Sequence, residues 1–316
     1  MAVVNTVTGP LDTSKMGFTL MHEHIFGAAA GITQNYPELM EKNYMKYIVD
    51  GLKEAKAAGI ETIVDATTLD LGRDIEILAE ASRQSGVNII ACTGWWLTMP
   101  RFISGNTPDQ WAAVFVREVK EGIAGTGIKA GILKGASDMA GVTKDEETIL
   151  RAVARAHHQT GLSIMLHSYS PGQVGRRQIE ILKEENVPLN RVKMDHSNDT
   201  TDVEYLIWML DQGCWLGLDR YPGQGVSPES RTRTLKALID AGYVDRLCPS
   251  HDWSLTRVEA EGMKPLWSRK GREEWNPHAF LYINNVVIPH LKELGVDETT
   301  IKTLFVDNPR RFFEGS

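Results

Sequence analysis

The sequence lacks the features that would place the chain in a membrane, in an oxidising compartment or on nucleic acid. Its 316 residues include only three cysteines, which are far apart and lie in apolar runs typical of reduced core thiols in a cytoplasmic protein. No stretch is apolar for long enough to span a membrane, and the first residues do not form a basic and then apolar leader. The net charge of −7 and the lack of any basic run argue against a nucleic-acid partner.

Two nucleotide-binding signatures are lacking as well. No Gly-x-Gly-x-x-Gly follows the first expected strand and no P-loop is present, which counts against a doubly wound open sheet. What the sequence does contain is 42% hydrophobic and 24% charged residues, the balance of a soluble globular protein with a sizeable core. The composition therefore favours a cytoplasmic enzyme of the α/β class that acts on a small molecule.

Short β-rich runs alternate with helix-like segments eight times, without a linker or a low-complexity tract between them. This alternation predicts a (β/α)8 TIM barrel built as a single domain by residues 1–316. The expected strands are 19–24, 62–67, 88–94, 130–135, 163–167, 191–196, 214–220 and 246–252. The expected helices are 44–58, 74–85, 111–123, 145–160, 175–184, 202–212, 230–241, 279–294 and 299–305.

Chemically active side chains gather at the ends of these strands. His22 and His24 are two residues apart on the first strand, so both imidazoles point to the same face. In a barrel the carboxyl ends of all strands meet at one mouth, where active sites lie. Six such side chains fall at strand ends. Any one of the six could be an ordinary hydrogen-bonded core residue, but together they predict a metal centre. The candidate ligands are His22, His24, Lys134, His167, His196 and Asp252.

Lys134 leaves two interpretations open. A lysine at the end of an apolar strand is costly to bury as a cation, and burial favours its neutral amine. A neutral amine can add CO2 and become a carbamate, an anionic ligand able to bridge two metals. The alternative is an ion pair with a carboxylate such as Asp138.

The same residues sit in motifs that resemble the binuclear amidohydrolase superfamily. Within it the chain is similar to the phosphotriesterase family, and especially to its phosphotriesterase-like lactonases. The similarity covers nearly the whole chain and is carried by Thr19-Leu20-Met21-His22-Glu23-His24, Asp70-Leu71-Gly72-Arg73-Asp74, Gly127-Ile128-Lys129-Ala130-Gly131, His196-Ser197-Asn198-Asp199-Thr200, Gly217-Leu218-Asp219-Arg220-Tyr221, Ser250-His251-Asp252 and Asp307-Asn308-Pro309-Arg310-Arg311.

The resemblance implies a set of roles for these residues. His22, His24 and Asp252 would hold a buried metal, His167 and His196 a more exposed one, and carbamylated Lys134 and a hydroxide would bridge the two. Zinc is the first candidate, and cobalt, manganese and iron also suit such ligands. Asp252 would take a proton from the hydroxide and pass it to the leaving group. The resemblance also implies a homodimer.

The catalytic roles of two further residues have structural alternatives. Asp199 could assist the proton relay from Asp252, or it could cap the following helix. Arg220 stands where the lactonases carry arginine and true phosphotriesterases carry histidine. It could instead form a structural ion pair with Asp219 or Asp199.

The residues expected to contact a substrate give mixed indications. Arg220 resembles the lactonases, whereas Trp96 and Trp253 are more like the phosphotriesterases. Tyr221 follows Arg220 in the same motif, and the segment from Trp253 to Trp275 is expected to form a loop over the pocket. Asp195 replaces the glycine that both groups usually carry before the histidine, and nothing in the sequence explains it.

The expected activity is metal-dependent hydrolysis of lactones, with N-acyl-homoserine lactones as leading substrates. Weak hydrolysis of aryl esters and organophosphate triesters would follow from the shared hydroxide. The alternative activity is that of a phosphotriesterase, or of another carboxylic-ester or amide hydrolase of the superfamily. A barrel that uses its metals structurally, or binds a ligand without turnover, is the non-enzymatic alternative.

Overall fold

A computed structural model describes residues 2–40, 42–257 and 268–315. Its centre is a nine-stranded sheet with the strand order β10-β9-β8-β7-β6-β5-β4-β3-β11, in which all neighbouring strands are parallel. The strands are β3 (Phe18–Gly27), β4 (Ile60–Asp65), β5 (Asn88–Gly94), β6 (Ile132–Ala136), β7 (Ile164–His167), β8 (Val192–Asp195), β9 (Trp215–Leu218), β10 (Leu247–Pro249) and β11 (Ser254–Arg257). A parallel sheet of this kind confirms the predicted α/β class.

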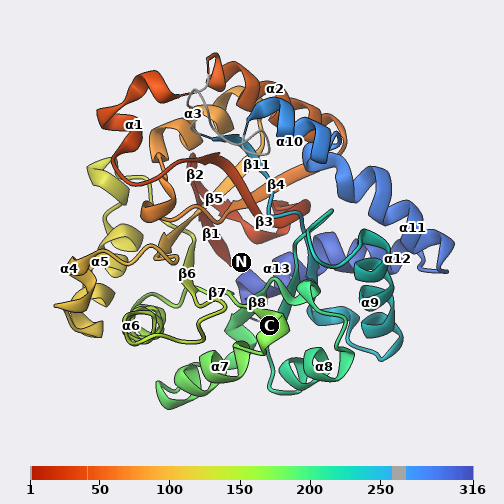
Figure 1. The fold of residues 1–316 in the computed structure, drawn as a ribbon. Coiled ribbons are helices and arrows are strands. Elements are labelled where there is room, and N and C mark those ends of the chain that lie inside the picture. Colours follow the sequence, from red (N-terminus) through yellow and green to blue (C-terminus); the bar gives the residue numbers. More distant parts are fainter. Residues whose placement is uncertain (1, 41, 258–267, 316) are drawn as a thin grey trace.

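Helices connect the strands and surround the sheet, which places the strands at the centre of the molecule (Figure 1). Local signals set their limits: α6 begins at a capping box formed by Thr143 and Glu146 and ends at Gly161, which has a left-handed backbone. The connecting helices are α2 (Tyr44–Ala57), α3 (Ile75–Ser85), α5 (Pro108–Lys120), α6 (Lys144–Thr160), α7 (Gly175–Glu184), α8 (Val203–Asp211) and α9 (Pro228–Asp240). No helix within the described ranges is long and apolar enough to cross a membrane.

Several shorter elements were not expected from the sequence. They are the hairpin β1 (Val3–Thr6) and β2 (Gly9–Asp12), and the helices α1 (Ile32–Asn35), α4 (Arg101–Ser104), α10 (Arg269–Trp275) and α13 (Asn308–Glu314). The helices α11 (Ile288–Glu293) and α12 (Glu298–Lys302) fall on the helices expected over 279–294 and 299–305. The helix expected over 279–294 is divided, with a π-helical stretch at Ile283–Val287 before α11. A second π-helical stretch, Thr303–Asp307, precedes α13. Pro289 and Pro309 are the second residues of the helices that follow these stretches. Proline has no backbone N–H, so neither residue can donate the hydrogen bond that a continuous regular α-helix would form at its position.

The amino-terminal end of the barrel is closed by packed apolar side chains. Val4 of the hairpin, Met16 and Phe312 of α13 form one buried cluster with inward-facing strand residues, which include Met21, Val64, Ile90, Ile132 and Met165. Phe312 packs edge-on against Trp215, with ring centroids 5.7 Å apart. This end is therefore a filled core, and the open mouth lies at the carboxyl ends of the strands.

The two ends of the sheet meet where β3 contacts the chain between β10 and β11. The backbone N–H of Asp252 donates to the carbonyl of His22 at 3.1 Å, and that of His24 donates to the carbonyl of Trp253 at 2.8 Å. Directly afterwards β11 pairs with β3 in parallel register. The strand expected over 246–252 is therefore shorter, since β10 ends at Pro249, and the additional strand β11, which follows it, pairs with β3 to close the barrel.

The carboxylate of Glu23 holds this closure together. It is fully buried on β3, and it accepts four hydrogen bonds from the segment that follows β10. Its Oε1 accepts from the Ser250 hydroxyl at 2.7 Å and from the His251 backbone N–H at 2.9 Å, and lies 2.6 Å from His251 Nδ1. Its Oε2 accepts from the Trp253 N–H at 3.0 Å. Asp252 stands between these anchored residues with φ of 54°, a strained backbone that needs such support.

We predict that Glu23→Gln lowers the free energy of unfolding by about 2–4 kcal/mol, measured by urea denaturation. The amide keeps the shape of the side chain but replaces one acceptor by a donor that faces the N–H groups of the closure. Glu61→Gln is the control, because Glu61 pairs with Lys56 at the surface and its loss should change stability by less than about 1 kcal/mol. Equal effects of the two substitutions would contradict the role given to Glu23.

Candidate metal centre

The six candidate ligands come from strands that are far apart in sequence, and the structure brings them to one cavity. All six line the wall of a cavity of about 810 Å3 at the barrel mouth, and they are His22, His24, Lys134, His167, His196 and Asp252. β3, β6 and β7 supply four of them, His196 directly follows β8, and Asp252 lies between β10 and β11. The predicted convergence of these strand ends is therefore present in the structure.

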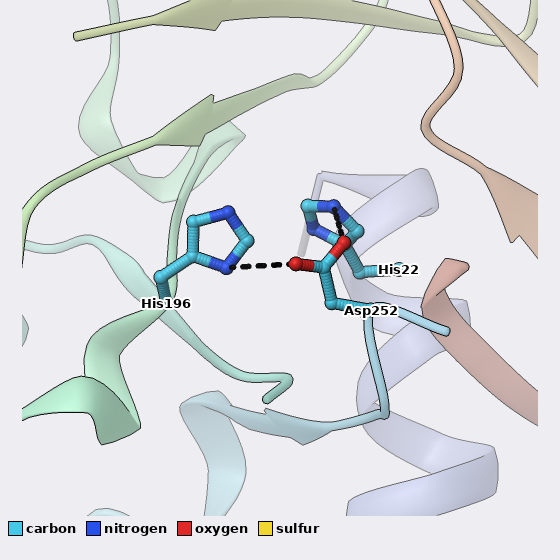
Figure 2. Close-up of side chains that lie close together, drawn as sticks. All are labelled: His22, His196 and Asp252. Atoms are coloured by element: carbon cyan, nitrogen blue, oxygen red, sulfur yellow. Dashed lines mark ion pairs between the residues drawn. The ribbon is translucent and has the colours of Figure 1, made fainter. Parts of the chain in front are cut away.

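His22, His24 and Asp252 form the first donor group. Asp252 Oδ1 lies 3.4 Å from His22 Nε2 and 3.1 Å from His24 Nε2. Figure 2 shows Asp252 between His22 and His196, with its other oxygen 4.0 Å from His196 Nδ1. Donor atoms of His22, His196 and Asp252 all lie within 4.8 Å of one another, so they can hold one ion.

His167 and His196 form the second donor group. His167 Nδ1 and His196 Nε2 lie 2.8 Å apart, and the two rings meet edge to face. The indole N–H of Trp96 also points at His167 Nδ1 from 3.2 Å, which places this ring over the site. Imidazole nitrogens that converge in this way are suitable ligands for zinc and related divalent metals.

Lys134 lies next to the first donor group. Its side chain is almost fully buried, its Nζ donates to the carbonyl of Ala66 at 2.9 Å, and it lies 3.5 Å from His22 Nε2. The alternative pairing with Asp138 is not formed, because Asp138 Oδ2 lies beside His167 Nε2, 3.5 Å away. Among the described residues no carboxylate forms an ion pair with Lys134. The amine is therefore positioned beside the metal ligands.

Three of the four ligand imidazoles have a second contact on the other ring nitrogen. His24 Nδ1 is 2.7 Å from the hydroxyl of Thr67, and His196 Nδ1 is 2.9 Å from Asp219 Oδ1. His22 Nδ1 lies 3.2 Å from Asp219 Oδ2. Such contacts fix which nitrogen carries the proton and leave the other free for a metal. Sequence analysis missed the roles of Thr67 and Asp219, although Asp219 ends its strand beside the predicted site residues.

Burial keeps three of the imidazoles neutral. It lowers the pKa of His24 and His167, and it lowers the pKa of His196 well below the ordinary value for histidine. Neutral imidazole is the form that binds metal ions. For Asp252, burial raises the pKa, but hydrogen bonds from His22 and His24 more than offset this and lower it well below the ordinary range. Asp252 is therefore an anionic ligand.

His22 has a different environment. Burial and the nearby Lys134 lower its pKa, but the carboxylates of Asp195 and Asp219 outweigh them and raise it to about 10. His22 is therefore the imidazole most strongly tied to carboxylates within the centre.

Arg220 contacts two carboxylates at the edge of the centre. Its Nε donates to Asp252 Oδ2 at 3.1 Å and its Nη1 donates to Asp199 Oδ2 at 2.6 Å. The partner of the expected ion pair is thus Asp199 and not Asp219. Asp199 also accepts from the fully buried Arg231 at 2.8 Å. The following helix α8 is capped by Asp202, which leaves the Asp199 carboxylate to the two arginines.

The cavity beside these residues has largely apolar walls. Trp96, Arg220 and Trp253, three of the residues expected to contact a substrate, line it together with Ile32, Leu39, Leu71 and Trp275. Tyr221 lies apart from them, because its side chain is fully buried and does not line the described part of the cavity. Its contact with a substrate stays a prediction. The middle of the expected loop over the pocket, residues 258–267, lies outside the described residues.

Comparison with known proteins identifies the family. The model of the phosphotriesterase family matches residues 2–313. The phosphotriesterase homology protein of Mycobacterium tuberculosis is 38% identical over 328 residues, which cover 99% of this chain and 98% of that protein. The aryldialkylphosphatase of Saccharolobus solfataricus is 35% identical over 307 residues, 96% of each chain. The N-acetyltaurine hydrolase of Xenopus tropicalis is 26% identical over 351 residues, which cover 98% of this chain and 97% of that protein.

These matches span the whole barrel and confirm the resemblance seen in the sequence motifs. The family consists of TIM barrels with binuclear metal centres, and the clustered histidines and aspartates at the mouth of this barrel agree with that chemistry. The chain is therefore a hydrolase that belongs to the phosphotriesterase family.

Proposed function

We propose that this protein is a metal-dependent lactonase that opens N-acyl-homoserine lactones. The observation that carries the proposal is the position of Arg220, which lines the cavity while it contacts Asp252 and Asp199. A fixed cation at this point can stabilise the negative charge that develops as an ester bond breaks. The apolar walls offer a place for an acyl chain.

The metal ligands that we propose are the side chains whose donor atoms lie close together in the cavity. His22, His24 and Asp252 would hold one divalent ion, and His167 and His196 would hold the second. Zinc is the first candidate, and cobalt, manganese and iron are suited to the same nitrogen and oxygen donors. Two such ions supply a water of lowered pKa and polarise the oxygen of the bond under attack.

Lys134 would bridge the two ions as a carbamate. Its neutral amine would add dissolved CO2, forming an N–C bond and releasing one proton, so that the two carbamate oxygens share one negative charge. The buried position of Nζ beside His22 Nε2, and the lack of a paired carboxylate among the described residues, support this proposal.

Asp252 and Asp199 would move the proton. Asp252 Oδ2 faces Arg220, and its Oδ1 faces the two histidines, so the carboxylate lies at the meeting point of the metal ligands and the cavity. It would accept a proton from the attacking water and deliver it to the leaving alkoxide. Arg220 contacts both Asp252 and Asp199, and Arg231 donates a second hydrogen bond to the carboxylate of Asp199. A fixed arrangement of this kind lowers the reorganisation needed during the reaction.

The second candidate function is hydrolysis of phosphotriesters or of another ester or amide. The relative from Saccharolobus solfataricus is named an aryldialkylphosphatase, and Trp96, the residue that resembles the phosphotriesterases, contacts His167. The relative from Xenopus tropicalis, at 26% identity, is named an N-acetyltaurine hydrolase. All these reactions need the same metal-activated water, so the substrate must be decided by assay.

A direct assay tests the lactonase proposal. Purified protein reconstituted with zinc, cobalt or manganese is expected to open acyl-homoserine lactones about 1,000-fold faster than His22→Asn, because metal chemistry supplies several kcal/mol of transition-state stabilisation. Paraoxon is assayed beside the lactones. Ring opening no faster than that of His22→Asn would end the proposal, and a higher kcat/KM for paraoxon than for every lactone would favour the phosphotriesterase alternative.

Arg220→Met tests the role of the guanidinium. We expect kcat/KM for lactones to fall about 100-fold, since a donor aimed at developing charge is lost. The loss should be smaller for paraoxon, whose nitrophenolate leaving group is weakly basic and needs little stabilisation. Arg220→Lys keeps the charge but not the forked contact with two carboxylates. Its kcat/KM for lactones should lie between those of the wild type and of Arg220→Met. Equal losses on both substrates would contradict a role at the leaving group.

Lys134→Ala tests the carbamate through metal content. Wild-type protein is expected to hold about two divalent ions per chain, measured by elemental analysis after gel filtration. The variant should lose them, and acetate or propionate should restore part of the content by replacing the carbamate. Lys129→Ala is the control, since Lys129 is exposed on the surface. Unchanged metal content in Lys134→Ala would refute the bridging role.

A further inference from the structure

β8 carries two opposite charges into the interior of the barrel. Lys193 and Asp195 are two residues apart, so both side chains point to the same face of the strand, and both are fully buried. The residues paired with Lys193 on the neighbouring strands are Met165 and Trp215. An unpaired charge in such a layer would be strongly destabilising. Lys193 Nζ donates to Asp195 Oδ1, which neutralises both within one strand.

The second oxygen of Asp195 points toward the metal centre. Asp195 Oδ2 lies 3.0 Å from His22 Nδ1, on the ring nitrogen opposite to the one that faces Asp252. Asp219 Oδ2 approaches the same nitrogen at 3.2 Å. His22 Nδ1 thus lies within 3.2 Å of two carboxylate oxygens, whereas the matching nitrogen of His24 meets one hydroxyl.

The backbone of β9 leaves room for this arrangement. A Cβ on Gly217 would lie 2.3 Å from Asp195 Oδ1 and 2.5 Å from Asp219 Oδ2. Only glycine therefore lets both carboxylates turn toward His22 between these strands.

His22, Asp195 and Asp219 have the donor atoms of a cation site, but the ammonium group of Lys193 already supplies a positive charge there. His22 Nδ1, Asp195 Oδ2 and Asp219 Oδ2 lie within 4.8 Å of one another. The Lys193 ammonium contacts Asp195 and lies 3.8 Å from Asp219 Oδ2. One positive and two negative charges leave a net negative charge, which faces the N–H of His22. An additional metal ion is therefore not needed to balance the group.

We propose that Asp195, neutralised by Lys193, is a positioning residue for the metal ligand His22. It fixes the His22 proton on Nδ1 and makes Nε2 a stronger donor to the metal, the effect expected of a carboxylate behind a ligand histidine. This inference rests on the proposed role of His22 as a ligand. It also explains the aspartate that precedes His196, for which the sequence motifs offered no reason.

The test replaces the pair together, since either single change would leave a buried charge without its partner. Lys193→Met with Asp195→Gly removes both charges and the carboxylate nearest to His22 Nδ1, leaving Asp219 Oδ2 at 3.2 Å, and apolar replacement of a buried pair is often neutral for stability. Lys193→Met with Asp195→Asn keeps an amide oxygen that can accept from His22. Cobalt affinity is measured by competition with a chelator, and the ligand field by the visible spectrum of the cobalt protein.

We expect the methionine–glycine variant to bind cobalt about 10–100-fold more weakly, with shifted visible bands. The methionine–asparagine variant should lie between it and the wild type. As a control, Arg73→Met with Glu118→Gln removes another buried pair, whose Nη2 and Oε1 are 2.7 Å apart outside the metal centre. This control should change neither affinity nor spectrum.

Two outcomes separate the inference from the proposal beneath it. If the methionine–glycine variant binds cobalt as tightly as the wild type with the same spectrum, the pair is only structural and the inference is overturned. If His22→Asn also leaves the affinity unchanged, the assignment of His22 as a ligand fails as well.

Discussion

The structure depends on closing a parallel sheet on itself, because β3 comes from the start of the chain and β10 and β11 come from near its end. Glu23 makes this closure with one carboxylate that receives four hydrogen bonds. The same contacts position Asp252, whose left-handed backbone would not persist without support. His22 and His24 flank Glu23 and point to the other face of β3. The same contacts therefore close the barrel and position the first ligand group.

Charge at the mouth is arranged in two layers. Imidazoles and the Asp252 carboxylate face the cavity, while Thr67 and Asp219 contact the imidazoles from behind. Low polarity around the centre strengthens each of these contacts and also makes any unpaired group costly. The same logic applies at the rim, where Arg220 and Arg231 share Asp199. The imidazoles are thus oriented by Thr67 and Asp219, which do not line the described part of the cavity, and the guanidinium is held by Asp199, which does.

The sequence predicted most of the fold and the meeting of the six candidate ligands at one cavity, and physical reasons account for what it missed. The limits of β5 and α7 were predicted because apolar runs with clear ends mark them, and His22, His24 and His167 because their positions on strands place them at one mouth. The contacts of Glu23 with residues 250–253 join opposite ends of the chain, so no local pattern indicates them. The choice of Asp252 as a partner for Arg220, and the burial of Tyr221, likewise depend on packing across the closed barrel.

The pairing of Lys193 with Asp195 on one strand limits how this sequence can change. Loss of either residue alone would leave an uncompensated charge where its side chain is fully buried, whereas loss of both would leave a smaller and neutral interior. The effects of substitutions at the two positions should therefore be strongly non-additive. A homologue with an apolar residue in place of Lys193 and glycine in place of Asp195 differs from this chain by two substitutions. A protein with only one of these substitutions is expected to be less stable than either of the two. The two positions are expected to vary together within the family, as a single inherited unit.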